Sequence, residues 1–301
     1  MAGEKAITGR RRFSSLARYS GWALVVASAL FLIIVGRSHW ATLSETSLPT
    51  NAWLAISGLV VLYGAALLLT GAVWHSMLTF TGAGASTLKH SMRAHTSAQL
   101  AKYVPGNVFH FLGRHMIHRA VGADDKRLAL SALLENLVLL LAAASVAAMC
   151  IALGGEGAYR DLAMIAGVGL FAGLAAILTG VRLKRLPLAP LLTGFAASLL
   201  FFTVMAGIVC AIAVLLGERL AWEVGGSGVA AWIAGFVVPG SPGGLGVREA
   251  AMVLLGGHTA KPEVLLLTAL LFRVVTFGGD LVCAVLGRLL FRGQQSAHPN
   301  P

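Results

Sequence analysis

Long apolar segments recur along the whole chain, and they limit its fold more than any other feature. A helix that crosses a bilayer core of about 30 Å needs about 20 apolar residues. Six segments come close to or exceed that length: 20–36, 53–78, 128–152, 161–181, 189–216 and 264–290. Charged residues make up only 12% of the chain, about half the share in soluble domains. Because the segments also lack the alternation of membrane strands, the sequence predicts an all-α polytopic membrane protein.

Positive charge is distributed unevenly between the loops. The net charge of +11 would suggest nucleic acid in a soluble protein, but in a membrane protein basic residues mark cytoplasmic loops. Seventeen of the 23 lysines and arginines fall on the side of both termini and residues 81–127, and five fall on the other. We therefore expect cytoplasmic termini and no nucleic-acid partner. Five tryptophans near span ends fit an aromatic belt: Trp22, Trp40, Trp53, Trp74 and Trp222.

Two further segments are partly apolar and are broken by a Pro-Gly pair. Residues 86–120 lie between two predicted spans on the inner side, and residues 228–256 lie between two on the outer side. A single crossing by the second segment would leave Arg288 and Arg292 outside, against the charge distribution. Each segment is therefore expected to be a re-entrant hairpin, which is tolerated only where protein or a cavity surrounds the broken backbone.

The two broken segments share the pattern Pro-Gly-x7-Arg. It occurs at Pro105, Gly106 and Arg114, and again 134 residues later at Pro239, Gly240 and Arg248. The spans follow nearly the same shift, which makes two unrelated turns a weaker explanation. We infer one transmembrane domain, 1–292, built from repeat A (about 15–153) and repeat B (about 154–292), with a disordered tail at 293–301. Because each repeat has three spans, the second is inverted, as in many secondary transporters.

The second broken segment has the composition of an anion-binding site. Its glycines leave backbone N–H groups open, and a helix that begins near Leu245 or Gly246 would direct its positive end at the bend. Arg248 offers a fork of donors suited to phosphate, and Glu249 would hold Arg248, cap the helix or carry a proton. The alternative is a turn whose Arg-Glu pair faces the headgroups. The candidates are Pro239, Gly240, Gly243, Gly244, Gly246, Arg248 and Glu249.

The first broken segment supplies the opposing candidates. They are Lys102, Tyr103, Pro105, Gly106, Asn107, His110 and Arg114. His115 and His118 follow at helical spacing, which raises metal binding as an alternative. The spacing suits only partial ligation and no HExxH motif is present. We therefore expect histidines that contact headgroups or the interface, with no metal and no cofactor.

Three ionisable residues fall inside predicted spans, namely Glu135, Arg273 and Asp280. A charge at the bilayer centre costs about 2.5–3.5 kcal/mol on insertion scales, so such residues usually face the bundle interior and pair. Glu135 and Arg273 occupy near-equivalent repeat positions, which suggests that they approach across the pseudo-twofold axis. That pair would be structural or linked to transport. Asp280 would carry protons or satisfy a loosened helix.

The two broken segments resemble the lysylphosphatidylglycerol synthase transmembrane family, also called the flippase-like domain family. The resemblance is carried by Tyr103-Val104-Pro105-Gly106 with Arg114 and by Pro242-Gly243-Gly244-Leu245-Gly246-Val247-Arg248-Glu249. It extends over roughly residues 15–292. It implies a bacterial inner-membrane protein linked to lipid translocation. In aminoacyl-phospholipid members such a domain flips a lipid that a separate synthase domain makes, and some standalone members occur beside hopanoid or glycan-lipid pathways.

No enzyme motif is present in the sequence, which lacks G-x-S-x-G, Walker A and Rossmann patterns, and we expect no catalysis. The leading hypothesis is a lipid flippase that moves an anionic phospho- or glycolipid between leaflets through a cavity between the two loops. One alternative is a proton-coupled transporter of a small soluble anion. The other is a non-transporting accessory subunit of a lipid or glycan biosynthetic enzyme. The oligomeric state is left open.

Overall fold

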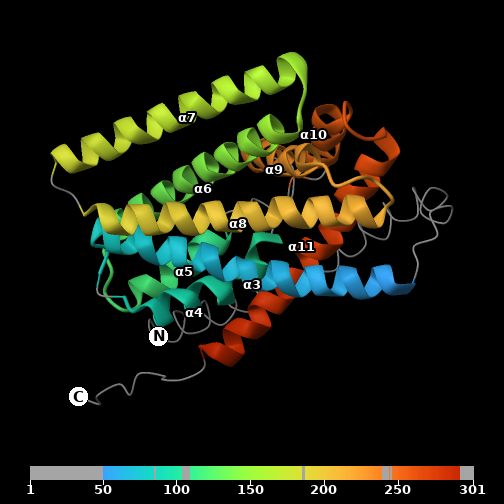
Figure 1. Ribbon diagram of the computed structural model, residues 1–301. Coiled ribbons are helices and arrows are strands. Elements are labelled where there is room, and N and C mark those ends of the chain that lie inside the picture. Colours follow the sequence, from blue (N-terminus) through green and yellow to red (C-terminus); the bar gives the residue numbers. More distant parts are fainter. Residues whose placement is uncertain are drawn as a thin grey trace, which may run out of the picture.

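The computed structural model describes residues 50–84, 86–103, 109–184, 187–238, 244 and 246–291. Every regular element in these ranges is a helix (Figure 1). The long helices are α3 (Thr50–Thr81), α6 (Asp125–Gly154), α7 (Gly157–Leu183), α8 (Leu188–Leu215) and α11 (Pro262–Leu290). The short ones are α4 (Leu88–Ala98), the 3-10 helix η1 (Gln99–Tyr103), α5 (Phe109–Arg119), α9 (Trp222–Val237) and α10 (Val247–Gly256).

The five long helices are long and apolar enough to cross a membrane. The shortest, α7, has 27 residues, or about 40 Å at a rise of about 1.5 Å per residue, which exceeds a hydrocarbon core of about 30 Å. These helices confirm five predicted spans, so the chain is an all-helical multi-pass membrane protein. The predicted span 20–36 lies outside the described residues, and the orientation of the termini stays a prediction.

Each broken segment is flanked by short helices that pack against each other. In the first, α4 and η1 contact α5, and in the second α9 contacts α10. α9 begins at Trp222, ahead of the predicted start at 228, because Glu223 in the first turn complements the positive helix end. α10 begins at Val247 after Gly246, whose φ of 78° favours glycine, close to the predicted helix start. Re-entry of these hairpins into the membrane stays a prediction.

The order of elements repeats along the chain. A span, two short helices and a span (α3, α4, α5, α6) are followed by the same series (α8, α9, α10, α11). α3 ends at Thr81 and α8 at Leu215, 134 residues later. α4 begins at Leu88 and α9 at Trp222, again 134 residues later. The shift between the Pro-Gly motifs is therefore also the shift between the helices around them.

The two series contact each other reciprocally. α4 of the first series packs against α11, the last span of the second, and α9 of the second packs against α6, the last span of the first. α3 and α8 lie side by side, and α11 crosses α3 (Figure 1). Each hairpin is therefore held by the opposite half, so a movement between the halves would move both hairpins.

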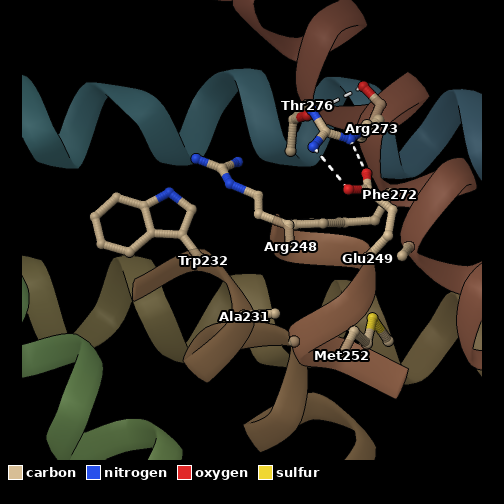
Figure 2. A pocket seen from close by; sticks show the side chains of 10 residues that line it. Ala231, Trp232, Arg248, Glu249, Met252, Phe272, Arg273 and Thr276 are labelled. Atoms are coloured by element: carbon tan, nitrogen blue, oxygen red, sulfur yellow. Dashed lines mark hydrogen bonds and ion pairs between the residues drawn. The ribbon is translucent and has the colours of Figure 1, made fainter. Parts of the chain in front are cut away.

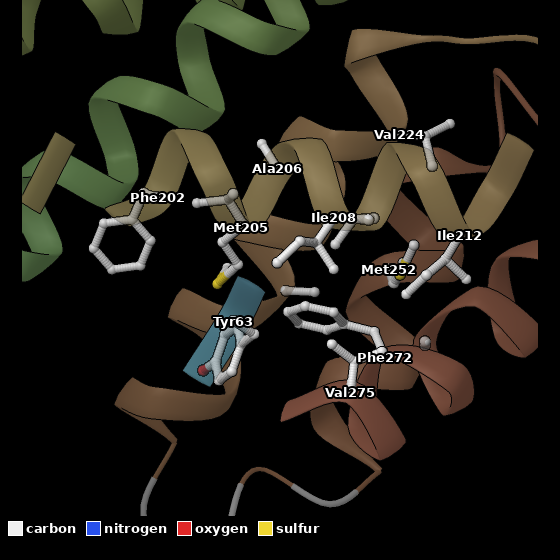
Figure 3. Close-up of a cluster of buried hydrophobic side chains, with 14 of the residues drawn as sticks. Tyr63, Phe202, Met205, Ala206, Ile208, Ile212, Val224, Met252, Phe272 and Val275 are labelled. Carbon is white, nitrogen blue, oxygen red and sulfur yellow. The ribbon is translucent and has the colours of Figure 1, made fainter. Parts of the chain in front are cut away.

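A large apolar core joins these elements. It includes Tyr63 of α3, Phe202 and Met205 of α8, Met252 of α10 and Phe272 of α11 (Figure 3). Tyr63 meets Phe272 edge-on with ring centroids 6.2 Å apart, a favourable aromatic geometry. The core thus fixes α10 and α11, which carry Glu249, Arg273 and Asp280, against α3 and α8.

α7 stands apart from this core. It packs along α6 and has few contacts with α8, and in Figure 1 it forms one edge of the molecule. Large apolar side chains on it are exposed, among them Ile165, Val168 and Phe171. A membrane helix satisfies its backbone internally, so such a surface suits contact with lipid tails.

Candidate functional site

A buried ion pair joins the first hairpin to the span that follows it. Arg114 of α5 donates from Nη1 to Oε1 of Glu135 at 2.8 Å and from Nη2 to Oε2 at 2.7 Å. Arg114 is 3% exposed and Glu135 is 2% exposed. A parallel two-bond pair of this kind is among the stronger hydrogen-bonded contacts in proteins. Arg114 is therefore held in this conformation by its own acid partner.

Neutral groups complete the surroundings of Arg114. Its guanidinium lies 4.4 Å from the ring centroid of Trp74, and Nη1 is 3.3 Å from Nδ1 of His95. Since arginine only donates, His95 Nδ1 is the acceptor, and the proton sits on Nε2, which is 3.0 Å from Oγ1 of Thr70. Burial, followed by Arg114, holds the pKa of His95 well below its usual range, which agrees with that neutral tautomer.

A second ion pair occupies the corresponding place in the other half. Arg273 of α11 donates to both carboxylate oxygens of Glu249 on α10 and, from Nη2, to the carbonyl oxygen of Gly244 at 2.9 Å. The suggested approach of Glu135 to Arg273 is therefore wrong. Each residue pairs within its own half, and the positions are exchanged: the arginine is on the hairpin in one half and on the span in the other.

A third pair links the two halves directly. Lys102, near the end of η1, places Nζ 2.6 Å from Oδ1 of Asp280 on α11. Gln99 Nε2 donates to the same oxygen at 3.2 Å. The Asp280 side chain is fully buried, whereas that of Lys102 is 26% exposed. This contact closes the first hairpin onto the last span of the second half.

Arg248 lies at the bend of the second hairpin. A Cβ on Gly235 would come within 2.4 Å of its Cγ, and one on Gly244 within 2.7 Å of its Nε. Only glycine at these two positions leaves room for the arginine side chain. Figure 2 shows the guanidinium of Arg248 extending toward Trp232, away from the ion pair of Glu249 and Arg273. The pocket that these four residues line has a volume of about 20 Å³, room for about one water molecule.

The charges of this region do not cancel. We call the following seven residues the buried charge cluster: Lys102, Arg114, Arg248, Arg273, Glu135, Glu249 and Asp280. Four are cations and three are carboxylates, which leaves one positive charge. Burial, with smaller effects from Arg114 and Lys102, lowers the pKa of His110 to about 3, so this histidine adds no charge near pH 7. The cluster is therefore poised for an anion.

The remaining candidates are only partly placed. The Tyr103 side chain and Pro105, Gly106, Asn107, Pro239, Gly240 and Gly243 lie outside the described residues. His115 and His118 have different partners, because Asp125 contacts His115 at 2.8 Å and Trp74 donates to His118 at 3.0 Å. Within the described ranges, no three His, Cys, Asp or Glu side chains are placed to hold a metal ion.

Four contributors were not identified from the sequence as parts of the site: Trp74, His95, Gln99 and Trp232. The assignment of Trp74 to an interfacial belt is wrong, because this side chain is 2% exposed and covers Arg114. His95 and Gln99 lie on the buried side of α4 and at the start of η1. Polar residues on the buried face of a short helix are the signal that would have found them.

Comparison with known proteins gives one match. Among curated proteins and among solved structures, no match to the chain was found. A family model does match, over a stretch that contains α8–α11 almost entirely and hence Arg248, Glu249, Arg273 and Asp280. That stretch, residues 179–287, matches the family described as lysylphosphatidylglycerol synthase TM region, which confirms the family that the Pro-Gly motifs suggested.

Proposed function

We propose that this protein moves an anionic phospholipid or glycolipid between the leaflets of the bacterial inner membrane. The headgroup would pass between the two broken hairpins while the lipid tails stay in the bilayer. The observation that carries the proposal is the buried charge cluster. It lies on both hairpins and on the spans that follow them, and it has an excess of one positive charge. A buried cation surplus of this kind is costly unless an anion joins it.

The repeated helix order supports a transporter with two related halves. In our proposal repeat B has the opposite orientation to repeat A, and the hairpins dip in from opposite faces. Such a design places the substrate near the bilayer midplane, where broken helices meet, and works by rocking one half against the other. The reciprocal packing of α4 on α11 and of α9 on α6 would move the two hairpins together.

The closed state of the pocket beside Arg248 also has a place in this scheme. A volume of about 20 Å³ accepts a water molecule but not a phosphate headgroup. The hairpins must therefore separate before a headgroup enters, and Lys102 with Asp280 and Arg273 with the Gly244 carbonyl are the described contacts that hold them to α11. The proposed function involves no chemical reaction, and its partners are anionic membrane lipids.

The test is movement of phosphatidylglycerol between leaflets in liposomes that contain the purified protein. Headgroup accessibility to an added reagent reports the rate. Wild type is expected to accelerate exchange, and Arg248→Ala is expected to slow it by about tenfold or more. A hydrogen bond to a charged group contributes about 1.5–3 kcal/mol, and about 1.4 kcal/mol corresponds to a factor of ten. Arg248→Lys, which keeps the charge without the fork, should be intermediate.

The matched control is Arg219→Ala, which removes an exposed arginine from the loop before α9 and should leave the rate unchanged. If Arg248→Ala exchanges lipid as fast as wild type, Arg248 does not bind the headgroup. Uptake of a soluble anion with no lipid exchange would instead favour the small-anion transporter. Absence of both activities, together with co-purification of a biosynthetic enzyme, would favour an accessory subunit.

A further inference from the structure

The three carboxylates of the buried charge cluster are held by different kinds of partner. Glu135 and Glu249 each accept hydrogen bonds on both oxygens from one arginine. Arginine stays charged at any ordinary pH and its planar fork fixes the geometry. Asp280 instead meets a lysine, whose ammonium is a compact charge on a flexible stem. Of the three pairs, the one with Asp280 is therefore the one built to exchange partners.

The position of Lys102 suits such an exchange. Its side chain is 26% exposed while that of Asp280 is fully buried, so an incoming anion can reach the ammonium without first reaching the carboxylate. Lys102 also lies just ahead of the first Pro-Gly motif in the chain. An anion that takes hold of Lys102 would thus act on the hairpin at its break.

We propose that the phosphate of an anionic lipid takes Lys102 away from Asp280, that Asp280 binds one proton from water as the pair opens, and that it releases this proton when the pair closes again. This inference rests on the proposed function and deepens it, because it couples lipid movement to one proton. The charge balances: the phosphate replaces the carboxylate beside Lys102, and the proton neutralises the carboxylate that Lys102 has left.

The need for a proton follows from burial. A fully buried carboxylate that loses its cation is left as an uncompensated charge, and such a group neutralises itself in preference to remaining ionised. Gln99 can stay with Asp280 in either form, because an amide both donates and accepts. In the closed state its Nε2 donates to the carboxylate at 3.2 Å, and after a flip its carbonyl oxygen would accept from the protonated acid.

The neighbours of Asp280 leave the proton as the compensating charge. Tyr63 of α3 interacts electrostatically with Asp280 and with Arg248 of α10, and Cys283 lies one turn along α11 and interacts with both Asp280 and Lys102. His95 and His110 interact with Lys102, and burial, aided by nearby cations, lowers the pKa of each. Both histidines therefore stay neutral near pH 7 and supply no replacement cation.

The experiment compares lipid exchange and proton movement in the same liposomes. Phosphatidylglycerol exchange is followed with and without a pH gradient, and a trapped pH dye reports protons. For wild type we expect a several-fold change of rate on imposing the gradient, and dye movement that requires phosphatidylglycerol. For Asp280→Asn the ratio of rates with and without the gradient should fall to one, and dye movement should fall to the protein-free level. Glu263→Gln, an exposed acid on the same helix, should behave as wild type.

A double variant, Lys102→Met with Asp280→Asn, removes both charges and leaves no buried charge unpaired, so it guards against misfolding of the single variant. It should show the same loss of gradient response. If either variant keeps the wild-type response and dye movement while lipid still moves, the coupling inference is overturned and the proposed function stands. If wild type moves no phosphatidylglycerol, both are overturned.

A second measurement uses wild type alone and tests the proton directly. Infrared difference spectra of the protein in detergent should gain a protonated-carboxyl band when phosphatidylglycerol is added at neutral pH, but not when zwitterionic phosphatidylcholine is added. No band with phosphatidylglycerol would overturn the coupling. An equal band with inorganic phosphate would uphold the exchange at Lys102 but identify a free anion as the ligand, which would count against the lipid function.

Discussion

Glu135→Gln is expected to lower the free energy of unfolding by about 3–5 kcal/mol, the usual cost of breaking a buried ion pair by removing one partner. The substitution keeps the size of the side chain and removes its charge. Arg114 then remains 3% exposed beside the neutral rings of Trp74 and His95. Against a typical total stability of about 5–15 kcal/mol, the loss should appear as a large fall in the midpoint of denaturant unfolding in detergent micelles.

Two comparisons identify the cause of that loss. Glu156→Gln removes an exposed carboxylate just before α7 and should change stability by less than about 0.5 kcal/mol. Arg114→Met combined with Glu135→Leu leaves no buried charge and should recover most of the stability, since replacing a whole buried pair with apolar groups is often neutral. A double variant no more stable than Glu135→Gln would mean that the pair itself, and not the orphaned cation, accounts for the loss.

The spans were predictable because the bilayer sets their length and composition. α3, α6, α7, α8 and α11 coincide with predicted apolar segments to within a few residues. The helix break at the second motif was predictable for a local reason, since Gly246 takes a positive φ that other residues rarely adopt. These features depend on neighbouring residues or on the solvent, and the sequence states both.

The pairing of the buried charges was not predictable in the same way. Glu135 contacts Arg114, which is 21 residues away, and not Arg273. Equivalence under the repeat suggested a contact across the axis, but each hairpin folds against its own following span and brings its own partner. Likewise Lys102 and Asp280 are 178 residues apart. Which of several cations meets a given acid depends on how the helices pack, and charge periodicity carries no information on that.

The crossing of α3 and α11 provides the other large expected effect. Gly279 of α11 faces Tyr63 and Gly64 of α3, and a Cβ on Gly279 would lie 2.5 Å from Tyr63 Cδ1 and 3.0 Å from the Gly64 nitrogen. Small residues at such crossings let two membrane helices approach closely. The Gly64 nitrogen is backbone and cannot move alone, so Gly279→Ala must push the helices apart.

We therefore expect Gly279→Ala to destabilise the protein by about 3 kcal/mol, the upper part of the usual cost of overpacking, in the same unfolding measurement. Gly58→Ala on α3 is the matched control. No atom lies within 4 Å of its added Cβ, and alanine is the better helix former by about 1 kcal/mol, so this variant should be as stable as wild type or more stable. Because Gly279 adjoins Asp280, separation of the helices would also loosen the contact with Lys102. Equal stability of the two alanine variants would contradict the close crossing and the placement of Asp280 that depends on it.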